Sequence, residues 1–185
     1  SERCQNCKQQ VYELLTTIYG ECRVNYSFPW PTHPTDYKGT AIGETLKYIH
    51  EGLRQLRSYD NFIKTKQMPP CDYFLPNPGF ILEFDESQHF TQPRLTALKL
   101  YPLEIKVGFS IGQWINLCQQ IDAKDNNPID RDERRAWYDT LRDLLPILHG
   151  IKPTVRLYSE SFQWCSLRSS SLADRKIIQS YLIEI

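Results

Sequence analysis

The sequence lacks the features that would place it in a membrane, secreted or repeat class. It has no run of 18 apolar residues, so we expect no transmembrane helix and no membrane partner. The first residues, Ser1-Glu-Arg-Cys-Gln-Asn6, lack the apolar segment of a signal peptide, which predicts a cytoplasmic location. No internal repeat or low-complexity segment is visible. The 185 residues are therefore expected to form one globular domain.

The chain also lacks an excess of either charge. Its 22 Lys and Arg residues balance its 22 Asp and Glu residues. This balance argues against a protein that coats nucleic acid by bulk electrostatics, although a local basic groove is compatible with it.

The cysteines form no complete metal motif. Cys4 and Cys7 have the spacing of half a zinc site, and Cys22, His33 and Cys165 are the available further ligands. No second Cys-x-x-Cys pair is present, so inert cysteines are the alternative to a zinc site. Without a secretion signal, all six cysteines are expected to be reduced.

Apolar periodicity predicts helices and strands in an order typical of an α/β protein with a mixed sheet. The segment 21–40, rich in proline and aromatic residues, is expected to be a loop. The tail, 171–183, fits either a helix or a strand. The expected helices are 8–20, 43–57, 93–100, 111–121 and one that begins at 131, and the expected strands are 59–65, 71–75, 80–85 and 154–158.

Acidic residues gather in the segment from Phe80 to His89. Because strand side chains alternate, Glu83 and Asp85 share one face of an otherwise apolar strand. Asp72 lies in the preceding strand, and a Pro/Gly turn predicts that the two strands form an antiparallel hairpin. An ionised carboxylate is costly to bury without a partner, so this group is the strongest candidate for chemistry.

Each of these residues also has a structural interpretation. Asp85 and Gln88 have the spacing of a capping box. Glu83 fits an ion pair with Arg94 or Arg156, and Asp72 fits an ion pair with Lys64. His89 fits a hydrogen-bonded core histidine. The charged run 131–135 is typical of a solvated helix face with internal ion pairs, and a DNA-facing role is the alternative.

The stretch Glu83-Phe-Asp85-Glu-Ser-Gln-His89 resembles the Glu-x-Asp-Gly-x-x-His motif of the very-short-patch repair endonuclease branch of the PD-(D/E)XK, restriction-endonuclease-like superfamily. The resemblance covers residues 43–100 and the strand 154–158, and it implies a restriction-endonuclease-like mixed sheet flanked by helices. Residues 1–42, an N-terminal helix and connector, and 103–150, a helical insertion, match no part of that family. The usual Lys is replaced by Asp85, and the usual Gly by Glu86.

The resemblance implies a metal-dependent endonuclease that hydrolyses DNA in defence or repair. Mg²⁺ or Mn²⁺ would bind Asp72, Glu83 and Asp85, because Mg²⁺ prefers oxygen ligands. His89 would act as general base, since histidine exchanges protons near neutral pH. In that family a Glu of the first helix often joins the site, and Glu44 is the matching residue, although an exposed acid at a helix start is its structural alternative.

Basic residues around this stretch would complete such a site. Arg94 and Lys99 would contact the phosphate backbone or stabilise the transition state, and Lys64, Lys99 or His89 would replace the missing Lys. A homodimer or a partner subunit is compatible with this hypothesis. Two other functions stay open: a non-catalytic module that binds nucleic acid or protein with a degenerate nuclease fold, and an interaction protein built around a zinc site at the cysteines.

Overall fold

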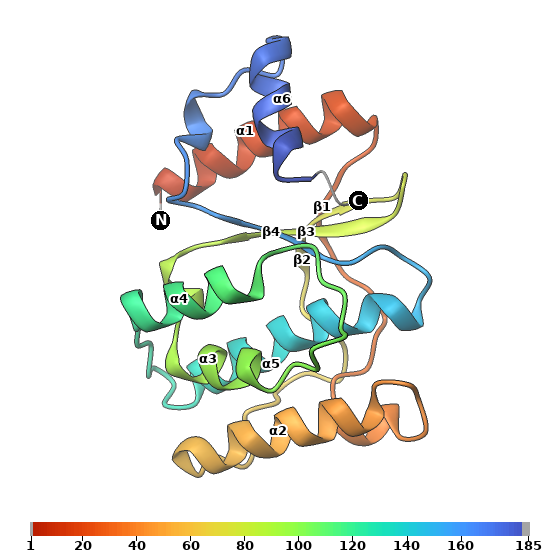
Figure 1. Cartoon of the computed structure of the whole chain (residues 1–185), viewed down its shortest axis with the longest axis vertical. Helices are drawn as coiled ribbons and strands as arrows, with labels where there is room; N and C mark the ends of the chain where they lie inside the picture. The colour runs from red at the N-terminus through yellow and green to blue at the C-terminus, as the bar shows by residue number, and fades with distance from the viewer. Residues whose placement is uncertain (1, 183–185) are drawn as a thin grey trace.

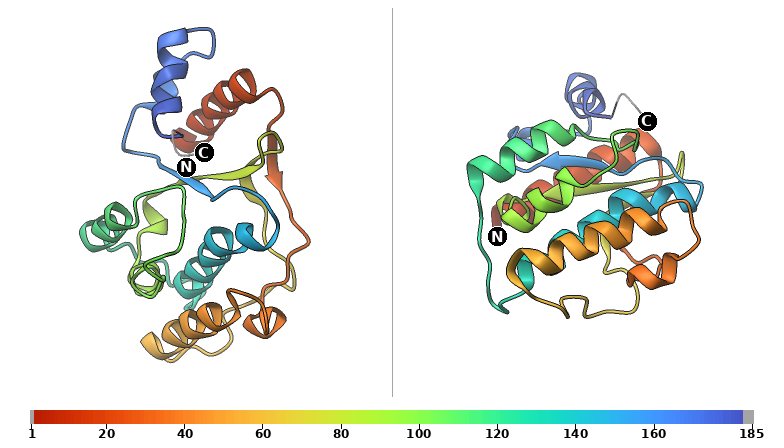
Figure 2. Two further views of the ribbon diagram at one scale, coloured as in Figure 1. Left: turned by 45° about the vertical axis from the view of Figure 1, so that its right-hand side comes forward. Right: turned by 60° about the horizontal axis from the view of Figure 1, so that its bottom comes forward.

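The computed structural model describes residues 2–182, and the side chains of residues 6–182. The chain forms a mixed α/β fold in which helices flank both faces of a four-stranded sheet (Figures 1 and 2). The elements are, in order, α1 (Glu2–Tyr19), β1 (Arg23–Tyr26), η1 (Pro34–Tyr37), α2 (Gly43–Arg57), β2 (Cys71–Leu75), β3 (Phe80–Asp85), η2 (Ser87–His89), α3 (Gln92–Lys99), α4 (Ile111–Ile121), α5 (Arg131–Leu144), η3 (Leu145–Leu148), β4 (Val155–Tyr158), η4 (Trp164–Ser166) and α6 (Leu172–Ser180).

The sheet has the strand order β1-β2-β3-β4. β1 pairs with β2 and β2 with β3 in antiparallel fashion, whereas β3 and β4 are parallel. A parallel pair needs a crossover connection, and α3, α4 and α5 lie within it. The mixed α/β class, the hairpin of β2 and β3, and the strand expected at 154–158, which is β4, are therefore confirmed.

The hairpin turn depends on a glycine. Gly79 adopts φ +103°, a backbone conformation that glycine enters without the steric cost paid by other residues. The turn brings β2 and β3 together in the register Tyr73↔Leu82, Phe74↔Ile81 and Leu75↔Phe80. This register fixes which side chains of the two strands are neighbours.

Each face of the sheet carries its own apolar core. On one face α1 and α6 pack against the sheet (Figure 2, left), where Phe80, Leu82 and Phe84 of β3 join a buried cluster with Leu14 and Trp164. On the other face lie α2, α3, α4 and α5 (Figure 1), which bury a second cluster containing Ile81 of β3. The alternation expected for β3 is thus confirmed. It directs Glu83 and Asp85, which follow Ile81 at every second position, toward the second face.

Two segments differ from the prediction. Residues 59–65 form no strand. The backbone N–H groups of Lys64 and Thr65 donate instead to the Tyr138 hydroxyl, at 3.1 and 3.2 Å. The connector 21–40 is not only loop, since it contains the edge strand β1 and the short helix η1. β1 is largely exposed, so it lacks the alternating apolar pattern that marks a half-buried strand. In the undecided tail, Leu172–Ser180 forms the helix α6, and residue 183 lies outside the described residues.

The prediction that all cysteines are reduced is wrong for one pair. Cys7 of α1 and Cys165 of η4 form a disulfide across a sequence separation of 158 residues. Cys71 and Cys118 are buried, free cysteines.

Candidate functional site

The predicted acidic residues of β2 and β3 meet where the two strands stop pairing. The backbone register ends at Tyr73↔Leu82, and carboxylates bind the next two backbone N–H groups. Glu83 Oε2 accepts a hydrogen bond from Asp72 N at 3.2 Å, and Asp72 Oδ2 accepts one from Phe84 N at 2.8 Å. The structure therefore brings Asp72 and Glu83 together as adjacent carboxyl groups between the strands.

The Asp72 end of this pair reaches the surface beneath α1. Lys8 Nζ lies 3.1 Å from Asp72 Oδ1 and 3.9 Å from Glu86 Oε1, and the Asp72 side chain retains 22% of its exposure. The backbone carbonyl of Lys8 accepts a hydrogen bond of 2.6 Å from the Tyr73 hydroxyl. Lys8, and not the expected Lys64, is the ion-pair partner of Asp72. Sequence patterns gave no signal for Lys8, because its pairing depends on how α1 packs over β2.

The other end of the pair is buried against α5. Arg142 Nε lies 2.8 Å from Glu83 Oε1, which is an ion-pair distance, but the N–H is not aligned and neither atom completes a hydrogen bond. Arg142 also donates to the carbonyls of Pro69 and Pro70. The structural alternative for Glu83 is thus an ion pair with Arg142 and not with Arg94 or Arg156.

Asp85 lies in a separate, fully paired environment. Its carboxylate accepts hydrogen bonds from Arg156 Nη1 at 2.8 and 3.1 Å and from Trp114 Nε1 at 2.8 Å. The capping-box interpretation is wrong, because Gln88 donates to Glu86 instead and Glu86 is the N-cap residue of η2. Asp85 therefore has less freedom to bind a metal than Asp72 and Glu83.

Arg156 joins Asp85 to two further carboxylates on α5. Its Nε donates to Asp143 Oδ1 at 2.9 Å and its Nη2 lies 3.3 Å from Asp139 Oδ1. His89 Nδ1 lies 2.8 Å from Asp139 Oδ2 and 3.7 Å from Asp85 Oδ1. Arg94 is buried and donates to Asp143 and the Tyr101 hydroxyl, so it does not face a substrate.

Burial and neighbouring charges set the protonation of this group. Burial, followed by the adjacent Asp72, raises the pKa of Glu83 well above its ordinary value. Burial alone would raise the pKa of Asp72 as well, but a hydrogen bond with Glu83 and the charge of Lys8 lower it. Neighbouring carboxylates repel one another, and these opposite shifts favour a proton on Glu83 over a proton on Asp72.

The remaining predicted residues lie elsewhere. Glu44 lines a cavity of about 500 Å³ together with His33 and His50 of the η1–α2 region. The helix α2 lies farther from the sheet than α3, α4 and α5 (Figure 1). Lys64 pairs with Asp130 at 3.5 Å, and Lys99 is exposed on α3. The charged run that opens α5 is only partly solvated, since Asp132 and Glu133 are buried and Glu133 pairs with Arg57.

The carboxyl groups of Asp72 and Glu83 could hold a hard cation, whereas no zinc site forms at the cysteines whose side chains the structure describes. Glu83 Oε1 is a buried oxygen without a hydrogen bond, and carboxylate oxygens are the ligands that Mg²⁺ prefers. Within residues 6–182, no three His, Cys, Asp or Glu side chains are grouped to hold a metal, so an ion would take its remaining ligands from water and substrate. Cys7 is in the disulfide, and the side chain of Cys4 lies outside the described residues.

Comparison of the chain with protein-family models, with curated proteins and with solved structures finds no match. None of the helices between residues 2 and 182 is both long and apolar enough to cross a membrane.

Proposed function

We propose that this chain is a metal-dependent nuclease with a restriction-endonuclease-like core that hydrolyses DNA phosphodiester bonds at Asp72, Glu83 and Lys8. The observation that carries the proposal is the placement of two adjacent carboxyl groups and one amino group where β2 and β3 stop pairing. The hairpin with its acidic residues, followed by a helical crossover to a parallel β4, supports the fold part of the proposal.

Asp72 and Glu83 would hold one Mg²⁺ or Mn²⁺. Such an ion stabilises negative charge on the phosphate and makes bound water a stronger nucleophile. Glu83 must be ionised to bind a cation. Its raised pKa opposes ionisation, so activity would require that Glu83 lose a proton when the metal binds.

Four further side chains of this chain have defined roles in the proposal. Lys8, which replaces the lysine missing after Glu83, would leave Asp72 and bind a phosphate oxygen of the substrate. His89 is oriented by Asp139 at Nδ1, which leaves Nε2 to accept a proton from the attacking water. Asp85 and Arg156 position the end of β3 and do not contact substrate.

Cleavage of supercoiled plasmid and single-stranded DNA with Mg²⁺ or Mn²⁺ tests this function. We expect metal-dependent cutting by the wild type, no cutting by Glu83→Gln, and a loss on the order of 100-fold for His89→Ala, as for removal of a general base. Asp60→Asn is the matched control, because Asp60 is an exposed carboxylate that pairs with Arg54; it should cut like the wild type. Equal cutting by wild type and Glu83→Gln would overturn the site, and no cutting by the wild type would overturn the activity.

A non-catalytic module that binds nucleic acid is the second candidate. The observation that favours it is that protein cations already pair with the acidic residues, Arg142 with Glu83 and Arg156 with Asp85. This candidate predicts no cutting with any metal, together with an affinity for DNA that falls as salt rises. Fluorescence anisotropy of a labelled duplex at several salt concentrations measures that affinity directly.

A further inference from the structure

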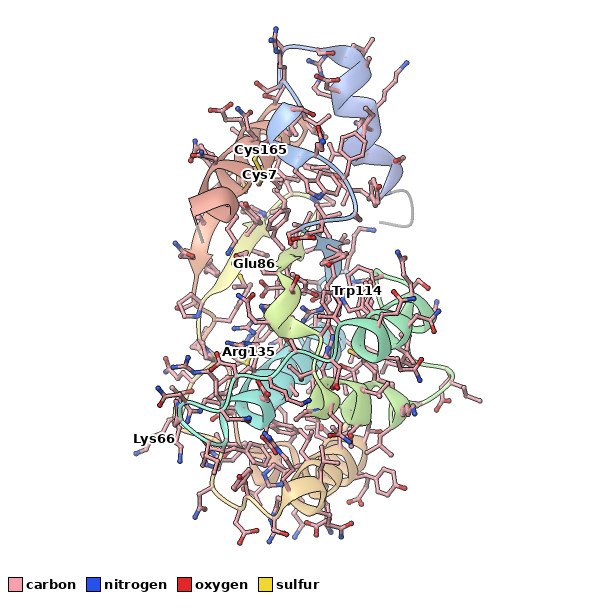
Figure 3. All side chains as sticks on the ribbon, turned by 90° about the vertical axis from the view of Figure 1, so that its left-hand side faces the viewer. Cys7, Lys66, Glu86, Trp114, Arg135 and Cys165 are labelled. Atoms are coloured by element: carbon pink, nitrogen blue, oxygen red, sulfur yellow. A yellow bond between two sulfur atoms is a disulfide. The ribbon has the colours of Figure 1, made fainter. Side chains whose placement is uncertain are left out.

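The disulfide lies one residue from the lysine of the candidate site. Cys7 precedes Lys8 in α1, and its sulfur is bonded to Cys165 of η4. Figure 3 shows the two cysteines together in the upper layer, with Glu86, a neighbour of Lys8, below them on the same side. The covalent link and the candidate site therefore share one turn of α1.

Both cysteines are accessible from solvent. Cys165 is exposed and Cys7 is half-buried, and both line an open cavity of about 1050 Å³ beside Phe84 and Trp164. Thiol–disulfide exchange requires that an attacking thiolate reach a sulfur atom, and this cavity provides such access.

The first part of α1 is the part of the helix that the disulfide holds directly. From Val11 onward the helix is held by fully buried apolar side chains, including Leu14 and Leu15. The turn that carries Lys8 is held by the disulfide and by the hydrogen bond from the Tyr73 hydroxyl to the Lys8 carbonyl. Breaking the disulfide is therefore expected to loosen this turn while the rest of α1 stays on the sheet.

We propose that Cys7–Cys165 is a reversible redox site at which a dithiol reductant releases Lys8 from Asp72. This proposal rests on the proposed function, in which Lys8 binds substrate phosphate.

The thiol–disulfide exchange needs no reactant other than the dithiol. One thiolate of the dithiol attacks a sulfur of the pair and forms a mixed disulfide, and the other sulfur leaves as a thiolate. The second thiol of the reductant then displaces the remaining cysteine. Two electrons and two protons pass to Cys7 and Cys165, which become thiols, and the reductant becomes a disulfide.

Acylation of lysines, followed by mass spectrometry, tests the release of Lys8 without reference to activity. The purified chain is treated with a succinimidyl acetate before and after reduction with dithiothreitol. We expect acylation of Lys8 to accelerate about tenfold on reduction as its turn opens locally, whereas the exposed Lys99 changes little. An unchanged Lys8 rate, with thiol alkylation confirming that Cys7 and Cys165 are reduced, would overturn the proposal.

Variants separate this proposal from the proposed function. Cys7→Ser/Cys165→Ser should show the fast Lys8 rate with and without dithiothreitol, and Cys22→Ser, which keeps the disulfide, should respond like the wild type. If the chain cuts DNA, reduction should lower cutting, because the loosened turn no longer holds Lys8 beside the site where it would bind the substrate phosphate. The decrease should match that of Lys8→Met, and reduction should not lower that variant further. Cutting by the wild type that is indifferent to reduction would overturn the regulatory role. Absence of cutting would overturn only the nuclease proposal, because the Lys8 rate is measured independently.

Discussion

At the scale of single residues, Arg156 is the centre of the buried charge around the candidate site. It is fully enclosed and pairs with Asp85, Asp139 and Asp143. Three carboxylates around one guanidinium leave surplus negative charge, which Arg94 and Arg142 offset through Asp143 and Asp139. Removing one partner from such a group leaves an uncompensated buried charge, which is more costly than the loss of a surface ion pair.

Asp139 should make the stability of the fold sensitive to acid. Burial alone would raise its pKa, but Arg156 and His89 outweigh burial and hold it well below the ordinary value. The unfolded chain then binds the proton more readily, so the stabilisation is complete above about pH 4 and is lost as the pH falls through the native pKa. We expect the free energy of unfolding in urea to fall more steeply between about pH 4 and pH 2 for the wild type than for Asp139→Asn. Asp60→Asn is the control, and its free energy of unfolding should depend on pH as that of the wild type does. If the wild type and Asp139→Asn showed the same pH dependence, Asp139 would not be the source of the acid sensitivity.

At the scale of elements, α5 joins the apolar core to the candidate site. Its apolar side was predicted from helical spacing, and Trp137, Leu141 and Leu144 are indeed buried. The same helix also presents Asp139, Arg142 and Asp143 to β3 and β4. The packing of α5 against the sheet therefore decides the positions of the charges that surround Glu83 and Asp85.

Shortening one leucine of α5 should test this coupling. Leu141 is fully buried, so Leu141→Ala is expected to lower the free energy of unfolding by about 2–5 kcal/mol. Leu103→Ala is the matched control, because Leu103 is fully exposed, and it should leave stability nearly unchanged. Urea denaturation followed by tryptophan fluorescence measures both variants. Similar losses for the two variants would contradict the core position of α5.

At the scale of the whole molecule, two apolar cores lie on opposite faces of one sheet, and the disulfide closes the chain around them. α1, near the start of the chain, and η4, after the last strand, are joined on the same face (Figure 1). Almost the whole chain lies within the closed loop, which restricts the unfolded state more than a short loop would.

Loss of the disulfide should therefore lower global stability. For a separation of 158 residues the chain-entropy model gives about 5 kcal/mol, and native disulfides typically contribute about 2–5 kcal/mol. We expect urea unfolding of Cys7→Ser/Cys165→Ser to show a loss in this range relative to the oxidised wild type. Wild type kept in dithiothreitol should match the double variant. If the double variant loses stability and the wild type in dithiothreitol does not, the loss comes from disturbed packing and not from the missing cross-link.

The sequence by itself determined those elements whose side chains repeat with a clear period. Helical spacing predicted α2 and α4, alternation predicted β3, and the turn at Gly79 predicted the hairpin, because these patterns depend on near neighbours in the chain. The shared face of Glu83 and Asp85, and the meeting of Asp72 with Glu83, followed from the same local rules. The sequence did not predict β1, because an exposed edge strand lacks the alternating apolar pattern of a half-buried strand.

Only the tertiary structure decided which charges meet. Lys8 and Asp72 are 64 residues apart, and Asp85 and Arg156 are 71 residues apart, so their pairing depends on how α1 and α5 pack and not on local spacing. The same holds for the bond between Cys7 and Cys165. Any lysine satisfies a carboxylate by charge alone, so the choice of Lys8 over Lys64 was fixed by the position of α1 over the sheet.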